Sequence, residues 1–283
     1  MKIASGEKVR NIFFDKAGVA IPGRELPDDL MVLGDLNLGG TNVERLPNGL
    51  AVKGNLILNN TKIRKLPSDI IVDGSINLEG SLIELLPDNL EVEGNLWLGN
   101  TKIKLLPRKL IVHGSISLND SSIEWLPADL VVERNLWLTN TKIRLLPDNF
   151  TVGENLWIDH TKIKWLPDNL TVNGSLWLGY TPIRSLPSNL TVGNSLWLIN
   201  AKIKTLPEDI MVGGSIDLSN SQLEYLPDNL DVGASLWLSN TKIRTLPKNL
   251  TVGGDLWLGG TSIDVLPEDL MVRGEIYFSS WRN

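Results

Sequence analysis

The chain has 283 residues, a formal net charge of −6 at pH 7 and no cysteine. It therefore has no disulfide framework and no thiol nucleophile, and its acidic balance argues against general attraction to nucleic acid or anionic membranes. Its start lacks the apolar core of a secretory signal, and no apolar run reaches the roughly 20 residues that span a bilayer. We expect a cytoplasmic protein with no membrane contact, or one delivered to a host cell without a cleavable signal peptide.

Residues 1–25 are predicted to form an amino-terminal cap built on a degenerate repeat. Ile12, Phe14, Ala17 and Val19 reproduce the spacing of apolar positions in the repeats that follow. We expect this segment to cover the open edge of the first coil, because an uncovered strand edge is a template for association.

From Leu26 onward the chain is one repeated unit. Thirteen Leu-Pro pairs recur every 20 residues and divide residues 26–283 into twelve complete repeats and a truncated thirteenth. Counted from the leucine of each pair, the consensus is Leu-Pro-x-x-Leu-x-Val-x-Gly-x-Leu-x-Leu-x-x-Thr-x-Ile-x-x. A fixed period of this length is typical of a solenoid, in which each coil contacts only its neighbours. We predict a single solenoid domain over residues 26–283.

The pattern inside each repeat predicts short strands. Apolar and polar residues alternate from position 5 to position 13, which indicates strands with Val and Leu facing a shared interior. A glycine at position 9 permits a corner, and Asn or Gly at position 15 tolerates the left-handed conformation of a tight turn. Thr at position 16 is expected to point inward and satisfy backbone groups from coil to coil. Helix is disfavoured throughout, so the predicted fold is mostly β, with about 13 coils.

The motif Leu-x-Leu-x-x-Thr-x-Ile-x-x-Leu-Pro resembles the bacterial leucine-rich repeat, with Thr where most members carry Asn. The resemblance covers residues 26–283. It is to the twenty-residue repeats of bacterial and phage proteins, and more distantly to the leucine-rich-repeat domains of type III secreted effectors. It implies a right-handed, curved solenoid with parallel strands on a concave face that binds protein. Unlike those effectors, this chain carries Leu-x-Val-x-Gly before the strand and lacks their cysteine-containing ubiquitin-ligase domain.

Tryptophan dominates position 12, which lies between two inward residues and therefore faces outward. The tryptophans at this position are Trp97, Trp137, Trp157, Trp177, Trp197, Trp237 and Trp257. With coils about 4.8 Å apart, neighbouring indoles are expected to stack into a ladder. The ladder is either a binding strip, because tryptophan is enriched at interface hot spots, or a means of stabilising the stack of coils.

Basic residues follow the tryptophans at positions 17 and 19, whereas coils with a small or polar residue at position 12 carry an acid at position 19. Between residues 126 and 205, four tryptophan coils run without an acidic interruption. The predicted partner-binding patch comprises Trp137, Trp157, Trp177, Trp197, Lys142, Arg144, Lys162, Lys164, Arg184, Lys202 and Lys204, with Trp97, Trp237 and Trp257 as secondary members. The alternative is a solvated face whose lysines pair with acids such as Asp148 and Asp168.

No constellation of residues points to catalysis. His113 and His160 occupy different positions of the repeat, more than two coils apart, so the sequence supports neither a paired-histidine metal site nor a catalytic dyad. We expect no catalytic residues, no metal and no cofactor. At the carboxyl end, Ile276, Phe278 and Trp281 are expected to form an open edge. That edge is either a homodimer contact or a short edge guarded by charged residues, namely Arg273, Glu275 and Arg282.

These patterns favour a non-catalytic protein-binding scaffold. Its Trp/Lys strip would hold a protein with an acidic and apolar surface, in the manner of a bacterial or phage effector or an inhibitor of a host process. The alternative is a glycan- or nucleotide-binding receptor, in which the indoles stack on rings and the basic column holds anions.

Overall fold

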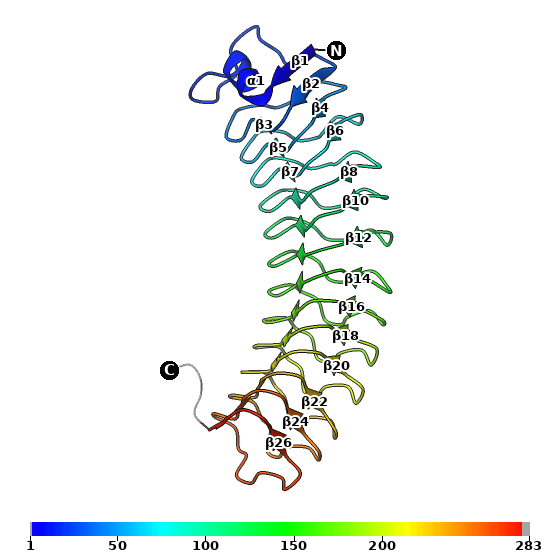
Figure 1. Cartoon of the computed structure of the whole chain (residues 1–283), viewed down its shortest axis with the longest axis vertical. Coiled ribbons are helices and arrows are strands. Elements are labelled where there is room, and N and C mark those ends of the chain that lie inside the picture. Colours follow the sequence, from blue (N-terminus) through cyan, green and yellow to red (C-terminus); the bar gives the residue numbers. More distant parts are fainter. Residues whose placement is uncertain (1, 279–283) are drawn as a thin grey trace. The chain divides into compact units, whose positions relative to one another are not determined.

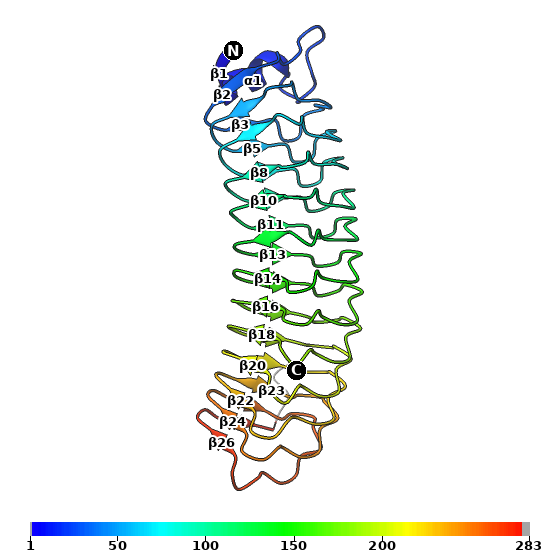
Figure 2. The same cartoon turned by 90° about the vertical axis from the view of Figure 1, so that its right-hand side faces the viewer.

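A computed structural model describes residues 2–278 (Figures 1 and 2). The chain divides into two compact units, Met1–Trp137 (unit 1) and Leu138–Asn283 (unit 2). Within each unit, successive 20-residue coils lie side by side, and each coil contributes two short strands. The predicted fold is confirmed: the chain is a parallel β-solenoid of about 12 turns with almost no helix.

The first strand of each coil contains the repeat valine. In unit 1 these strands are β2 (Leu30–Leu33), β4 (Ala51–Val52), β6 (Ile71–Val72), β8 (Glu91–Val92), β10 (Ile111–Val112) and β12 (Val131–Val132). In unit 2 they are β14 (Thr151–Val152), β16 (Thr171–Val172), β18 (Thr191–Val192), β20 (Met211–Val212), β22 (Asp231–Val232), β24 (Thr251–Val252) and β26 (Met271–Val272). Neighbouring strands pair in parallel with a register of one repeat, so valine lies on valine.

The second strand of each coil carries position 12. In unit 1 these strands are β3 (Leu36–Asn37), β5 (Leu56–Ile57), β7 (Ile76–Asn77), β9 (Leu96–Trp97), β11 (Ile116–Ser117) and β13 (Leu136–Trp137). In unit 2 they are β15 (Leu156–Trp157), β17 (Leu176–Trp177), β19 (Leu196–Trp197), β21 (Ile216–Asp217), β23 (Leu236–Trp237), β25 (Leu256–Trp257) and β27 (Ile276–Tyr277). They form a parallel sheet in each unit, again paired residue for residue one repeat apart.

The interior consists of the apolar columns that the alternation predicted. Every repeat valine from Val32 to Val252 is buried. The two residues that flank Trp177, Leu176 and Leu178, are both 0% exposed. Because each strand pairs in register with the next, these side chains form continuous apolar columns through each unit, and burial is shared between neighbouring coils.

Each second strand from β3 to β25 ends in the tight turn predicted at position 15, where His160 and Tyr180 both have a φ of 57°. The role expected for threonine is wrong in one respect. Thr161 is buried, but its Oγ1 donates to the carbonyl oxygen of Ile158 in its own coil at 2.7 Å, so the hydroxyl closes its own turn and does not link coils. A threonine three residues after Ile158 reaches that carbonyl more directly than one in a neighbouring coil.

A second left-handed position, at position 4, was not predicted. Asn149 and Asn169 adopt it with φ values of 54° and 58°, directly after the Pro-x pair. Their side chains continue from coil to coil, because Nδ2 of Asn169 donates to Oδ1 of Asn149 at 3.0 Å and Nδ2 of Asn189 donates to Oδ1 of Asn169 at 3.1 Å. Asparagine suits this position because it tolerates the left-handed region and offers both a donor and an acceptor.

The amino-terminal segment contains a short helix, in a chain for which little or no helix was expected. The strand β1 (Lys2–Ser5) pairs in parallel with β2, and α1 (Gly6–Phe13) follows it. At the junction, a Cβ on Gly6 would collide with the carbonyl oxygen of Asp35, so only glycine allows this close approach. The guanidinium of Arg10 donates to the carbonyl oxygens of Asn37 and Gly39, both at 3.1 Å, and so satisfies acceptors beside β3.

The repeat spacing proposed for this segment is not followed. Phe14 is buried, but Ile12 lies in the helix and is 45% exposed, and Val19 is 47% exposed. Ile12 lies in the helix α1, where the repeat spacing had predicted a strand. Val9, rather than Ile12, is the buried apolar side chain of this helix. At the other end of the chain, Phe278 is exposed, whereas Trp281 and Arg282 lie outside the described residues. The homodimer contact there stays a prediction.

Candidate functional site

The tryptophans of position 12 project from the second sheet of each unit. Each is the last residue of its two-residue strand, and the leucine before it is buried, so the indole faces away from the interior. All of them are half-buried except Trp257, which is 9% exposed. A half-buried indole on a paired strand has lost most of its rotational freedom before any partner arrives.

In unit 2 the indoles form the ladder that the spacing predicted. The rings of Trp157 and Trp177 stack with centroids 4.3 Å apart and planes 10° apart. Trp177 and Trp197 continue the stack at 6.3 Å and 11°, and Trp257 stacks on Tyr277 at 3.8 Å. We call Trp157, Trp177 and Trp197 the unit 2 indole ladder. The facing rings of Trp157 and Trp177 cover one another, whereas the longer separation of Trp177 and Trp197 leaves those two rings offset.

Polar residues at position 12 do not break the stacking. Asp217 is paired in register with both Trp197 and Trp237, yet these two indoles stack with centroids 6.0 Å apart. Asp217 is 8% exposed, because the indoles close over it. In unit 1, Trp97 and Trp137 likewise approach to 5.7 Å across the coil of Ser117. The sequence did not predict that tryptophans two coils apart would approach each other across a coil with a small or polar residue at position 12.

The basic residues at positions 17 and 19 of unit 2 are exposed, as expected of a charged surface. Lys204 pairs with Glu224 at 2.8 Å. Within residues 2–278, no ion pair joins a basic residue of the predicted patch to Asp148 or Asp168, and the patch members without any ion pair are Lys142, Arg144, Lys162, Lys164, Arg184 and Lys202. Residues 138–205 contain seven basic and four acidic residues, a net charge of +3 in a chain of net charge −6.

Hydrogen bonding to Glu224 raises the pKa of the Lys204 ammonium, and the same bond lowers the pKa of the Glu224 carboxyl. Both groups are solvated, so this pair contributes little to stability. The other cations of the patch are available to a partner carrying carboxylates or phosphates.

The turn that separates the tryptophans from the basic columns carries two further aromatic residues. His160 and Tyr180 stack with ring centroids 4.5 Å apart, and Nδ1 of His160 lies 3.0 Å from Oδ2 of Asp159. His160 lies at position 15, where the sequence predicts a tight turn. Its positive φ agrees with that interpretation, and the stacked pair extends the aromatic surface beside Trp157 and Trp177.

Two exposed tryptophans at position 20, Trp125 and Trp165, were not included in the predicted patch although they are 52% and 57% exposed. Trp165 borders a hollow of about 460 Å³. The residues that line this hollow are Lys164, Trp165, Pro182, Arg184, Ser185 and Lys202. The sequence could have indicated their exposure, because position 20 lies next to the inward leucine of the following Leu-Pro pair and its side chain therefore points outward.

The patch predicted from the sequence is thus distributed over both units. Trp157, Trp177 and Trp197 come together in unit 2, whereas Trp137 belongs to unit 1 and contacts Trp97. The basic residues of the patch all lie in unit 2.

The sequence matches no protein-family model and no curated protein. Among solved structures, YopM, a leucine-rich effector protein from Yersinia pestis, is similar, with 17% identity, coverage of 86% of this chain and 88% of YopM, and a TM-score of 0.50. A leucine-rich-repeat protein of Leptospira interrogans has 19% identity, coverage of 83% and 84%, and a TM-score of 0.42. YopM from Yersinia enterocolitica has 19% identity, coverage of 89% and 71%, and a TM-score of 0.42.

In residues 2–278 we find no helix that could span a lipid bilayer. The parallel strands, the 20-residue period, the buried Leu and Val columns and the similarity to YopM agree with one another. This chain therefore has the leucine-rich-repeat fold.

Proposed function

We propose that the chain is a non-catalytic protein-binding scaffold, and that unit 2 holds a partner with an acidic and partly apolar surface. The observation that carries the proposal is the unit 2 indole ladder, a row of half-exposed tryptophans fixed on a hydrogen-bonded sheet. Tryptophan is among the residues most enriched at interface hot spots, and a side chain already held in place loses little entropy on binding.

The charges of unit 2 favour an acidic partner. Six exposed cations of the patch have no ion pair within the described residues, and the segment that carries them has a net charge of +3. Such a cluster attracts an oppositely charged surface and speeds its association, and the effect weakens as salt is added. The acidic remainder of the chain opposes general attraction to polyanions, which favours a local contact over a nucleic-acid groove.

The geometry of the ladder favours a protein over a stacked ring as its ligand. A sugar or base that stacks on an indole needs a free ring face, and Trp177 has a neighbouring indole on each side, at 4.3 and 6.3 Å. Ring edges, by contrast, suit apolar and edge-to-face contacts with side chains of a protein. The similarity to YopM, which is described as an effector, motivates the narrower proposal of a bacterial or phage effector that inhibits a host process.

One observation favours the alternative of a small anionic ligand. The hollow of about 460 Å³ beside Trp165 offers an exposed indole together with Lys164, Arg184 and Lys202. A nucleotide or a sulfated sugar would match that combination, because the ring stacks on tryptophan and the cations bind the anion. This site lies apart from the ladder in the repeat, so separate substitutions distinguish the two functions.

The test is a peptide array that varies acidic and aromatic content, probed alongside glycan and nucleotide arrays. We expect acidic peptides with apolar side chains to bind, and Trp157→Ala with Trp177→Ala to abolish that binding in a protein whose circular dichroism is unchanged. Trp125→Ala, at an exposed tryptophan of unit 1 outside the predicted patch, is the matched control and should bind normally. Retention of glycans or nucleotides that is lost in Trp165→Ala, a variant outside the predicted patch, would instead support the alternative.

A further inference from the structure

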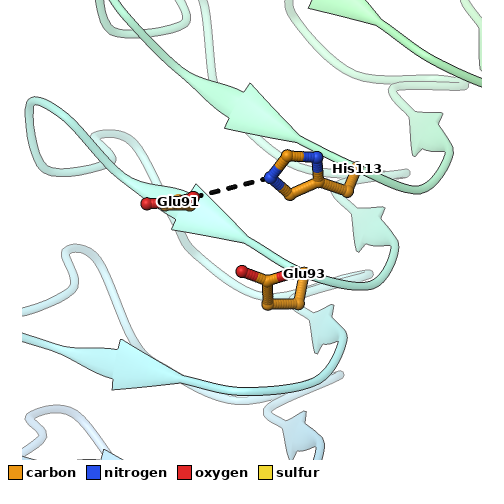
Figure 3. Close-up of side chains that lie close together, drawn as sticks. All are labelled: Glu91, Glu93 and His113. Atoms are coloured by element: carbon orange, nitrogen blue, oxygen red, sulfur yellow. Dashed lines mark hydrogen bonds and ion pairs between the residues drawn. The ribbon is translucent and has the colours of Figure 1, made fainter.

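A cluster of carboxylates surrounds His113 on unit 1, away from the unit 2 indole ladder. The donor atoms of Glu91, Glu93 and His113 all lie within 4.8 Å of one another (Figure 3). Nε2 of His113 is 3.5 Å from Oε1 of Glu91, and Nδ1 is 3.0 Å from Oε1 of Glu133. The imidazole therefore has a carboxylate on each of its two nitrogens.

The repeat itself brings these side chains together. Glu91 and Glu93 flank the buried Val92, so both side chains leave the same outer face of β8. His113 occupies the position of Glu93 in the next coil, and its backbone N–H donates to the carbonyl oxygen of Val92 at 3.0 Å. Parallel pairing of β8, β10 and β12 fixes this arrangement, with Glu133 one coil further on. The donors are thus held by a rigid sheet.

We propose that Glu91, Glu93 and His113 form a binding site for a divalent transition-metal ion of the Zn²⁺ class. The ligand set is one imidazole nitrogen and two carboxylate oxygens, with the remaining positions filled by water. Ions such as Zn²⁺ accept this mixture, whereas Ca²⁺ requires six to eight oxygens and Mg²⁺ prefers oxygen alone. Exposure of the Glu91 and His113 side chains, 59% and 37%, leaves room for those waters.

One distance in the cluster is compatible with coordination of a shared ion. Two ligands of a tetrahedral Zn²⁺, each about 2.0 to 2.1 Å from the ion, are roughly 3.3 Å apart. The 3.5 Å between Nε2 of His113 and Oε1 of Glu91 is close to that separation and long for a hydrogen bond. A donor atom of Glu93 lies within 4.8 Å of the other two donors, and its exposed side chain can turn toward the ion.

Glu133 supplies the arrangement expected around a metal-bound imidazole. A histidine that binds a metal through one nitrogen usually donates the other N–H to a carboxylate, which fixes the ring. Glu133 accepts at Nδ1 in this way, so Nε2 faces Glu91. A hollow of about 280 Å³ adjoins the cluster, and Asp73, Asp88, Glu91 and Glu93 are among its lining residues. This acidic hollow gives a cation a path to the site.

The experiment is calorimetric titration of the full chain, without a polyhistidine tag and freed of metal by a chelator, with ZnCl₂ alone. We expect saturable binding of one ion per chain. His113→Ala should weaken binding at least tenfold, Glu93→Gln should weaken it as well, and the positioning variant Glu133→Gln should weaken it roughly 10- to 100-fold. The matched control is His160→Ala, since His160 is the chain's other histidine and also lies beside a carboxylate, at 3.0 Å.

Circular dichroism establishes that each variant is folded. The absorbance of bound Co²⁺ reports coordination by the imidazole without relying on the calorimetric signal. Binding that His160→Ala leaves intact and His113→Ala removes supports the site. Absence of saturable binding, or equal binding by wild type and His113→Ala, would overturn it and leave these residues as an ion-pair cluster. The substitution Glu93→Gln changes the protein less than His113→Ala, which removes a ring. Loss of the Co²⁺ spectrum in Glu93→Gln is therefore a second test that supports the site.

Discussion

The stacking of Trp157 on Trp177 is expected to contribute a measurable coupling energy. Their centroids are 4.3 Å apart with planes 10° apart, the geometry of a well-stacked aromatic pair. Such pairs contribute about 0.5 to 1.5 kcal/mol beyond the area they bury. A double-mutant cycle with Trp157→Ala and Trp177→Ala should therefore give an interaction free energy of about 1 kcal/mol.

The same cycle with Trp157 and Trp237 provides the control. These residues are four repeats apart in unit 2, which corresponds to about 19 Å at 4.8 Å per strand. Substitutions at that distance normally add within about 0.3 to 0.5 kcal/mol. Both double variants lose two indoles from the same column, so their compositions change alike. The two pairs differ in whether their rings are in direct contact.

The assay is urea unfolding followed by far-ultraviolet circular dichroism, because removing tryptophan changes the fluorescence signal itself. The urea dependence of the unfolding free energy must be the same in all variants for their midpoints to be compared. A coupling energy for Trp157 and Trp177 no larger than that of the control pair would refute the stacked ladder. A larger coupling would show that the row behaves as one rigid surface.

Three further substitutions test the buried valine column, the turn and the surface ion pair. Val152→Asp places a charge where the side chain is 0% exposed, and should cost about 3 to 5 kcal/mol of stability, whereas an unchanged melting curve contradicts the inward assignment. Thr161→Val removes the bond to the Ile158 carbonyl and should cost about 1 kcal/mol by urea unfolding; no loss would contradict that role. Glu224 has a pKa below its ordinary 4.5, so its stabilisation is present above that pH and lost below it. Because the pair is solvated, Glu224→Gln should reduce the acid dependence of stability only slightly, and a large reduction would contradict that description of the pair.

Periodicity in the sequence was sufficient to predict the coil. The invariant valine and the Leu-x-Leu pair identify the inward columns, because a 20-residue period leaves one way to bury every such side chain. The left-handed turn at position 15 followed from its asparagines and glycines. The amino-terminal helix was missed because the segment was interpreted with the spacing of the repeat, although Val9, Ile12 and Phe13 have the i, i+3, i+4 spacing of an amphipathic helix.

The details of the surface could not be predicted in the same way, because they depend on side chains that reach across coils. The closing of Trp197 and Trp237 over Asp217 requires indole orientations that position in the repeat does not fix. The cluster at His113 was missed because its donors come from neighbouring coils and are far apart in the sequence. A search for paired histidines excludes such a set, whereas aligning outward residues one repeat apart would have found Glu93, His113 and Glu133 in one column.

Thiol labelling measures most directly which side chains face water. The chain contains no cysteine, so single cysteines introduced by Leu176→Cys, Trp177→Cys and Leu178→Cys report on three consecutive positions of one coil. Leu176 and Leu178 are 0% exposed and Trp177 is half-buried, so only the middle cysteine should react rapidly with a water-soluble maleimide under native conditions. Rapid labelling at the two leucine positions, with protection at position 177, would contradict this assignment. It would mean that the leucines face water and that the tryptophans are buried.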